Sequence, residues 1–204
     1  YIVQGFGNVG YWTAHFMNEI GAIMTAVQDA SCSLYNENGI NPEALLAYAD
    51  KNGGLIKGFP DATEFDSKEF YGVACDIAIP AALGNQITLE NVDMIKASMI
   101  AEGANGPTDV DAEAKLLIRG IDIIPDILCN GGGVIGSYYE WLQNRRAENW
   151  KIEEVLRLLE DKLNTSFHKT VDAAKEYNTD WRTAAYIVAL KRLELTYKER
   201  GVFP

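Results

Sequence analysis

A glycine-rich turn near the start of the chain has the residue types and spacing of a phosphate-binding loop. A strand-like run, 1–4, leads into Gly5, Gly7 and Gly10, and a helical pattern follows. We expect Gly5 to permit a tight turn, Gly7 to let backbone approach a pyrophosphate, and Gly10 to let the helix pack closely on the strand. The helix N-terminus would then offer N–H groups and a positive dipole end to the phosphates. A glycine turn that serves packing alone is the alternative.

An acidic residue follows the second strand-like run, at the distance typical of a ribose-binding carboxylate. Asp29 lies 19 residues after Gly10 and just beyond the run 22–27. A carboxylate at this place hydrogen-bonds a free 2′-hydroxyl and repels a 2′-phosphate. Lys and Arg are absent from residues 31–41. The sequence therefore favours NAD as the coenzyme over NADP.

Three segments of small residues follow later strand-like runs, and they suit the approach of a nicotinamide and its ribose. Their candidate contact residues are Ala81, Ala82, Asn105 and Asn130. In parallel sheets the ligand lies at the carboxyl ends of the strands, and an Asn side chain both donates and accepts hydrogen bonds. Turn chemistry alone would explain each segment singly, but three at consecutive strand ends favour a binding edge.

Short apolar runs alternate with helical patterns along the first three quarters of the chain. The alternation predicts an α/β fold of Rossmann type, with a doubly wound, mostly parallel six-stranded sheet and C-terminal helices. One of the six, 55–57, is expected at the edge of the sheet. The first helix is expected over 8–20, with an apolar stripe of buried side chains. The residues of that stripe are Val9, Trp12, Phe16 and Ile20.

Capping residues mark several helix ends. Asn41 before Pro42 predicts one helix N-terminus, and Thr108 and Asp180 predict two others. A long amphipathic pattern predicts a helix over 152–177. We divide the chain into a dinucleotide-binding domain, 1–146, and a helical extension, 147–204, which packs on that domain or on one outside this sequence.

Composition excludes several classes of function. The 204 residues carry 29 acidic and 18 basic side chains, a net charge of −11, which argues against a partner nucleic acid or an anionic membrane surface. No apolar run is long enough to span a membrane. Three widely spaced Cys residues give neither a disulfide framework nor a metal site and suit a reducing cytosol. Tyr1 falls inside a strand-like run, so we expect the sequence to be part of a longer protein.

Six motifs together resemble glutamate dehydrogenase. They are GFGNVG at 5–10, DIAIPAA at 76–82, AEGANGPT at 101–108, NGGGV at 130–134, SYYEW at 137–141 and RTAAY at 182–186. The resemblance covers almost the whole chain, but only the C-terminal, coenzyme-binding domain of that enzyme. The run at 102–108 is far more specific than the glycine turn.

The resemblance implies NAD(P)-linked oxidative deamination of L-glutamate to 2-oxoglutarate and ammonia, by a homo-oligomer that is a hexamer in the family. The pyrophosphate contacts that it implies are Phe6, Gly7, Asn8 and Val9. It further implies that Asp29 holds the adenosine ribose and that Ala81, Ala82, Asn105 and Asn130 line the nicotinamide side. Val134 and Ser137 would contribute to the pocket for the substrate side-chain carboxylate.

The sequence also departs from the family pattern. The family's catalytic lysine and aspartate belong to a Lys-Gly-Gly context in another domain, and this sequence has none, so no catalytic residue is assigned here. Gly131, Ile135 and Gly136 replace residues that are commonly Ala, Thr and Val. Ile135 removes a hydroxyl near the coenzyme, and Gly136 loosens the start of a helix.

Two alternatives remain. One is a related dehydrogenase for leucine, phenylalanine or valine, and Ser137 discriminates against it because a hydroxyl helps a γ-carboxylate and does little for an alkyl side chain. The other is a dinucleotide-binding module without catalysis. We expect a cytoplasmic location, with the mitochondrial matrix left open.

Overall fold

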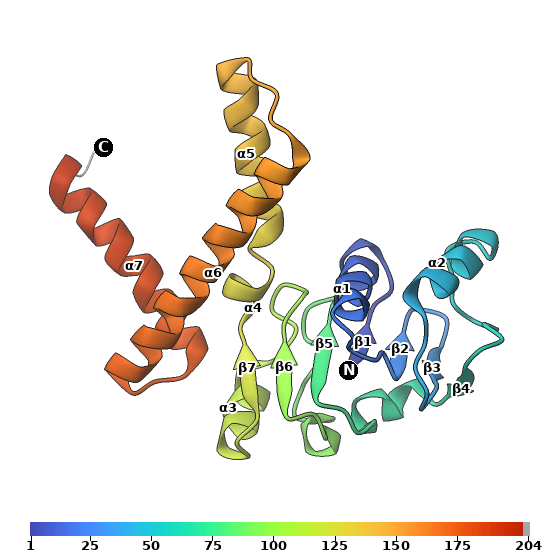
Figure 1. Ribbon diagram of the computed structural model, residues 1–204. Coiled ribbons are helices and arrows are strands. Elements are labelled where there is room, and N and C mark those ends of the chain that lie inside the picture. Colours follow the sequence, from blue (N-terminus) through green and yellow to red (C-terminus); the bar gives the residue numbers. More distant parts are fainter. Residues whose placement is uncertain (202–204) are drawn as a thin grey trace. The chain divides into compact units, whose positions relative to one another are not determined.

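The computed structural model describes residues 1–201, and the chain forms two compact units, Tyr1–Ile123 and Ile124–Pro204 (Figure 1). The first unit holds the sheet and the second is helical. The division predicted from the sequence, 1–146 and 147–204, stays a prediction, and its last three residues lie outside the described residues.

The sheet has seven strands in the order β4-β3-β2-β1-β5-β6-β7, which Figure 1 shows edge to edge. Their bounds are β1 Ile2–Gln4, β2 Ala26–Gln28, β3 Ser33–Tyr35, β4 Thr63–Phe65, β5 Ile77–Pro80, β6 Met99–Ala101 and β7 Asp122–Ile124. β1 is parallel to β2 and β5, and β5 is parallel to β6. The predicted α/β class with a mostly parallel sheet is confirmed, with seven strands where six were expected.

Alternate residues of the short strands point to opposite faces of the sheet. Ile2 belongs to one core cluster, which includes Leu116 of α3 (Val110–Ile118). Val3 belongs to the other, which includes Leu45 of α2 (Pro42–Lys51). Because β1 and β5 are apolar on both faces and both faces are covered, these two strands are continuous apolar runs in the sequence, whereas the edge strand β4 is mostly exposed.

The edge of the sheet differs from the prediction. β3 and β4 pair antiparallel beside β2, and the predicted strand 55–57 is a turn. Gly53 and Gly54 have φ of +66° and +82°, which turns the chain away from an extended path. The backbone N–H of Ile56 donates to the Asp29 carboxylate and not to a neighbouring strand.

The helix α1 (Asn8–Glu19) forms as predicted but presents a different face to the sheet. Gly10 and Ala14 are its buried residues. The predicted apolar stripe is exposed, with exposed fractions of 49% for Val9, 52% for Trp12 and 55% for Phe16. Small residues face the sheet because the helix lies too close to β1 for large ones.

Helix caps follow the sequence closely. The Asn41 side chain accepts from the backbone N–H of Ala44 at 2.8 Å, with Pro42 at the first helical position. Asp180 caps the last helix by accepting from the N–H of Thr183 at 2.8 Å. Both predicted caps are confirmed. α3 is capped by Asp109, one residue after the predicted Thr108.

Two 3-10 helices complete the first unit, η1 (Ser67–Gly72) and η2 (Val92–Met94). The second unit consists of α4 (Asp126–Cys129), α5 (Gly132–Arg146), α6 (Ile152–Tyr177) and α7 (Trp181–Arg200). The predicted bounds of α6 are confirmed. Arg182 at the start of α7 forms an ion pair with Asp126 of α4 at 2.9 Å, which ties the two helices together. Across residues 1–201, no helix is both long and apolar enough to cross a membrane.

The contact between α1 and β1 generates a stability prediction. A Cβ at Gly10 would lie 1.8 Å from the Gly5 carbonyl oxygen, whereas a Cβ at Gly7 meets nothing within 4 Å. Gly10→Ala is therefore expected to lower the free energy of unfolding by about 3 kcal/mol or more, because backbone has to move. Gly7→Ala is expected to change it by less than about 1 kcal/mol. Urea denaturation of both variants measures the difference, and equal losses would contradict the packing account.

Candidate functional site

The turn between β1 and α1 places Gly5 against the ends of two neighbouring strands. Its N–H donates to the carbonyl of Gln28, at the end of β2, at 2.6 Å. Its φ is +95°, and a Cβ would lie 2.8 Å from the carbonyl oxygen of Ala81, after β5. Only glycine fits both the conformation and the space.

Neither the backbone conformation nor the packing of the protein requires glycine at position 7. Its φ is −86°, which any residue adopts, and the space around its missing Cβ is open. Gly7 is also the N-cap of α1, and no side chain caps that helix. The first-turn N–H groups therefore have no side-chain acceptor, which is the arrangement that binds phosphate at a helix N-terminus. An open glycine at this helix start fits the close approach of an anionic ligand.

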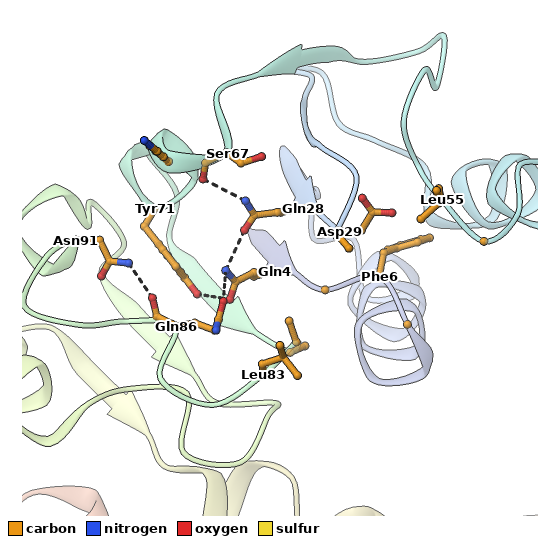
Figure 2. A pocket seen from close by; sticks show the side chains of 17 residues that line it. Gln4, Phe6, Gln28, Asp29, Leu55, Ser67, Tyr71, Leu83, Gln86 and Asn91 are labelled. Carbon is orange, nitrogen blue, oxygen red and sulfur yellow. Dashed lines mark hydrogen bonds between the residues drawn. The ribbon is translucent and has the colours of Figure 1, made fainter.

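A cavity of about 740 Å³ opens beside this turn (Figure 2). Its volume lies in the range of small-molecule sites. It is lined by the strand ends, by the turn after α2, by the start of η1 and by the segment after β5. The lining residues are Gln4, Gly5, Phe6, Gly7, Gln28, Asp29, Ala30, Gly54, Leu55, Ser67, Lys68, Tyr71, Ala81, Ala82, Leu83, Gln86 and Asn91.

The fold brings six of the predicted site residues together in the cavity wall. They are Gly5, Phe6, Gly7, Asp29, Ala81 and Ala82. Asn8, Val9 and Gly10 follow in the first turn of α1 without lining the cavity, and Asn105 lies outside its wall. Whether any of these residues contacts a coenzyme stays a prediction.

Gly103, which the sequence reasoning did not single out, packs the segment after β6 against the turn. A Cβ there would lie 3.2 Å from that of Ala81 and 3.4 Å from Val9 Cγ1. Its position directly after a buried strand was the available signal.

The other predicted residues belong to the helical unit. Asn130 ends α4. Val134, in the first turn of α5, is 76% exposed. The Ser137 hydroxyl donates to the carbonyl of Gly133 at 3.0 Å, one turn earlier on the same helix. Val134 and Ser137 are three residues apart on α5, so they share a face of that helix.

The Asp29 carboxylate organises two segments of the cavity wall. It accepts hydrogen bonds from the backbone N–H and hydroxyl of Ser31 at 2.7 and 2.6 Å, and from the N–H of Cys32 at 3.1 Å. Its second oxygen accepts from the N–H of Ile56 at 3.0 Å, which holds the turn that contains Leu55. That second oxygen carries one protein hydrogen bond and can accept another from a ligand hydroxyl. The sequence indicated Asp29 but not its structural partners.

A network of polar side chains at the strand ends was missed by the sequence reasoning. The Gln4 amide donates to Gln28 Oε1 at 2.9 Å and to Gln86 Oε1 at 3.2 Å. The Tyr71 hydroxyl donates to Gln4 Oε1 at 2.7 Å (Figure 2). Burial raises the pKa of Tyr71 far above its ordinary value, so the hydroxyl stays protonated and keeps this bond. The available signal was that Gln4 and Gln28 each end an apolar strand.

A seven-stranded, mostly parallel sheet with a glycine turn at its central β1–α1 connection defines an α/β domain of the Rossmann class. The sequence profile of the glutamate/leucine/phenylalanine/valine dehydrogenases matches residues 1–201. The chain belongs to this family, and the resemblance to a coenzyme-binding domain is confirmed.

Individual relatives agree with that assignment. The chain is 39% identical to glutamate dehydrogenase from Thermotoga maritima over 203 residues, which is 99% of the chain and 49% of that protein. It is 39% identical to an NAD-specific glutamate dehydrogenase from Staphylococcus aureus over 200 residues, 98% of the chain and 48% of that protein. The chain thus spans about half the length of these relatives.

Solved structures have the same fold. The hetero-hexameric glutamate dehydrogenase from Thermus thermophilus superposes with a TM-score of 0.90 at 28% identity, covering 100% of this chain and 48% of that one. Glutamate dehydrogenase from Peptoniphilus asaccharolyticus superposes with a TM-score of 0.84 at 37% identity. The match covers 99% of this chain and 47% of that one.

The hydrogen bonds of Asp29 generate a second prediction. Asp29→Asn places an amide N–H₂ against at least one backbone N–H, so we expect a loss of about 2–3 kcal/mol in the free energy of unfolding. The Ile56 amide should also exchange its hydrogen faster, as measured by NMR. Asp50→Asn, an exposed substitution on α2, is the matched control. Unchanged stability and unchanged exchange at Ile56 would show that Asp29 does not hold the turn.

Proposed function

We propose that this chain is the NAD-binding part of a glutamate dehydrogenase, which deaminates L-glutamate oxidatively to 2-oxoglutarate and ammonia. The observation that carries the proposal is the open glycine at the uncapped start of α1, beside a cavity of suitable size. NAD, when bound, supplies the hydride acceptor. The chain's own residues bind and orient it: Phe6, Gly7, Asn8 and Val9 at the pyrophosphate, and Asp29 at the adenosine ribose.

NAD is the proposed coenzyme because of the chemistry of Asp29. A carboxylate accepts from a ribose 2′-hydroxyl and repels a 2′-phosphate. The 39% identity to an NAD-specific glutamate dehydrogenase supports the same choice. Ala81, Ala82, Asn105 and Asn130 are proposed on the nicotinamide side.

L-Glutamate is the proposed substrate, with Val134 and Ser137 on the wall that faces its side-chain carboxylate. The relatives named above are glutamate dehydrogenases, and the hydroxyl at Ser137 suits a carboxylate. The family also includes enzymes for leucine, phenylalanine and valine, which are the second candidates. We propose that the whole protein forms a homo-oligomer, specifically a hexamer. The relative from Thermus thermophilus is also a hexamer, although a hetero-hexamer.

A dinucleotide-binding module without catalysis is the competing class of function. We expect the 204-residue chain to bind NADH with micromolar to millimolar affinity. We also expect it to turn over no substrate, because no catalytic residue is assigned within it. Calorimetry and a glutamate oxidation assay test both parts. Glutamate oxidation by the full-length protein would distinguish the enzyme from the module.

The open space at Gly7 predicts a selective loss of binding. Gly7→Ala should weaken NADH binding by about tenfold or more, because the new methyl group occupies the place of the pyrophosphate. Its stability should stay close to that of the unaltered chain, since no protein atom lies near that methyl group. Calorimetric titration with NADH is the measurement. Unchanged affinity would mean that the pyrophosphate does not lie at this turn.

Ser137→Ala in the full-length enzyme tests the substrate wall. The hydroxyl must leave the Gly133 carbonyl to donate to a carboxylate, and we expect its loss to weaken glutamate binding by about 1–2 kcal/mol, seen mainly in KM. Norvaline, which lacks the carboxylate, should be unaffected. Ser166→Ala is the matched control, since the Ser166 hydroxyl makes the same kind of bond to Lys162 on α6. Equal losses of affinity for glutamate and norvaline would show that the Ser137 hydroxyl stabilises its helix and does not bind the substrate carboxylate.

A further inference from the structure

The segments that follow β5 and β6 are paired with each other by backbone hydrogen bonds beyond the ends of their strands. The N–H of Asn85 donates to the carbonyl of Gly106 at 2.8 Å. The N–H groups of Gln86 and Ile87 both donate to the carbonyl of Pro107, at 2.7 and 2.9 Å. Because the bonds run from one segment to the other, the position of the second segment is set by that of the first.

Close packing at Gly84 brings the same two segments together. A Cβ at Gly84 would lie 3.2 Å from the carbonyl oxygen of Asn105 and 3.3 Å from that of Gly106. These distances are shorter than an ordinary van der Waals contact, so glycine allows the approach. Asn105 does not line the cavity, but its backbone is held against a segment that does.

Gln86 attaches these paired segments to the centre of the sheet. Its side-chain Oε1 accepts from Gln4 Nε2 at 3.2 Å, and its Nε2 donates to the Gly84 carbonyl at 3.0 Å. Its own carbonyl accepts from the side-chain amide of Asn91 at 2.7 Å (Figure 2). Its N–H is the donor to Pro107 described above. Side chain and backbone of Gln86 are therefore both fixed, one toward β1 and the other toward the segment after β6.

The Gln4 amide that holds Gln86 has its orientation set by Tyr71. The Tyr71 hydroxyl stays protonated, because burial raises its pKa far above the ordinary value, and it donates to Gln4 Oε1. Gln4 Nε2 must then face the other way, where its two hydrogens meet Gln28 Oε1 and Gln86 Oε1. Gln4 is buried. Removal of the Gln86 acceptor would therefore leave a buried N–H without a partner, which is costly.

We propose that Gln86 is a positioning residue, which sets the place of the segment around Asn105 and so the geometry in which the coenzyme and the substrate react. The inference rests on the proposed function, in which Asn105 lies on the nicotinamide side. A misplacement of about 1 Å at a reacting centre slows a reaction steeply, because the reacting atoms must be close and aligned. The bond from Gln4 to Gln86 prevents such a misplacement.

Hydrogen exchange in the 204-residue chain without ligand tests the positioning directly. Gln86→Met keeps the length of the side chain and removes both of its hydrogen bonds. We expect the amides of Asn85 and Ile87, which donate to the segment after β6, to exchange about tenfold faster, the effect of losing about one hydrogen bond. The amide of Tyr11, inside α1, should be unchanged. Gln143→Met removes a hydrogen-bonded amide from α5 and is the matched control.

Steady-state kinetics of the full-length protein test the consequence for the reaction. Gln86→Met should lower kcat for glutamate oxidation about tenfold and change KM for glutamate by less than about twofold, because alignment is lost while the substrate wall is untouched. Gln143→Met should change neither constant. Gly84→Ala disturbs the same segment without removing the glutamine, and the backbone of Gly84 lies outside the left-handed region, so alanine can adopt it. It should lower kcat severalfold, again with little change in KM.

The outcomes separate the positioning role from the proposed function. Unchanged exchange at Asn85 and Ile87 in Gln86→Met would overturn the positioning role. So would faster exchange with an unchanged kcat, or a raised KM with an unchanged kcat, which would make Gln86 a residue of uniform binding. If Gln86→Met does not fold, an unchanged kcat in Gly84→Ala overturns the proposal. Failure of the unaltered full-length protein to oxidise glutamate would overturn the proposed function itself, whatever the exchange rates show.

Discussion

The close approach of helix α1 to strand β1 is the constraint on which the site depends. At Gly10 the helix backbone lies so near the Gly5 carbonyl that no side chain fits between them. This contact draws the start of α1 over the carboxyl ends of the strands, and Gly5 completes the turn with a positive φ. Gly7 is left between them with open space and an uncapped helix start. Two glycines serve the fold, and the third is available to a ligand.

Polar side chains at the strand ends then shape the cavity around that turn. Gln4 bridges Gln28, Gln86 and Tyr71, and Asp29 holds the turn at Ile56. Each of these groups would be costly to bury without a partner, so the network allows the strand ends to be both polar and ordered. The walls of the cavity are thereby held together by hydrogen bonds between the protein's own groups.

Features governed by local chemistry were predictable from the sequence. The glycine turn, the caps at Asn41 and Asp180, the bounds of α6 and the α/β class all depend on residues close together in the chain. Features that depend on distant segments were not. The antiparallel strands β3 and β4, the bonds from Asp29 to Ile56, and the arrival of Lys68 in the cavity wall depend on contacts that no local pattern encodes. The buried face of α1 was mistaken because its large residues suggested the core, whereas the close contact with β1 admits only small ones.

The central claim is that the turn at β1–α1 is the place where this chain binds a dinucleotide. A titration of the isotopically labelled chain with NADH, followed by amide chemical shifts, tests it most directly. The account predicts the largest shifts at Phe6, Gly7 and Asn8, with further shifts at Ala30 and Ala82 across the cavity. Shifts confined to the groove between α6 and α7, with the glycine turn unmoved, would contradict it.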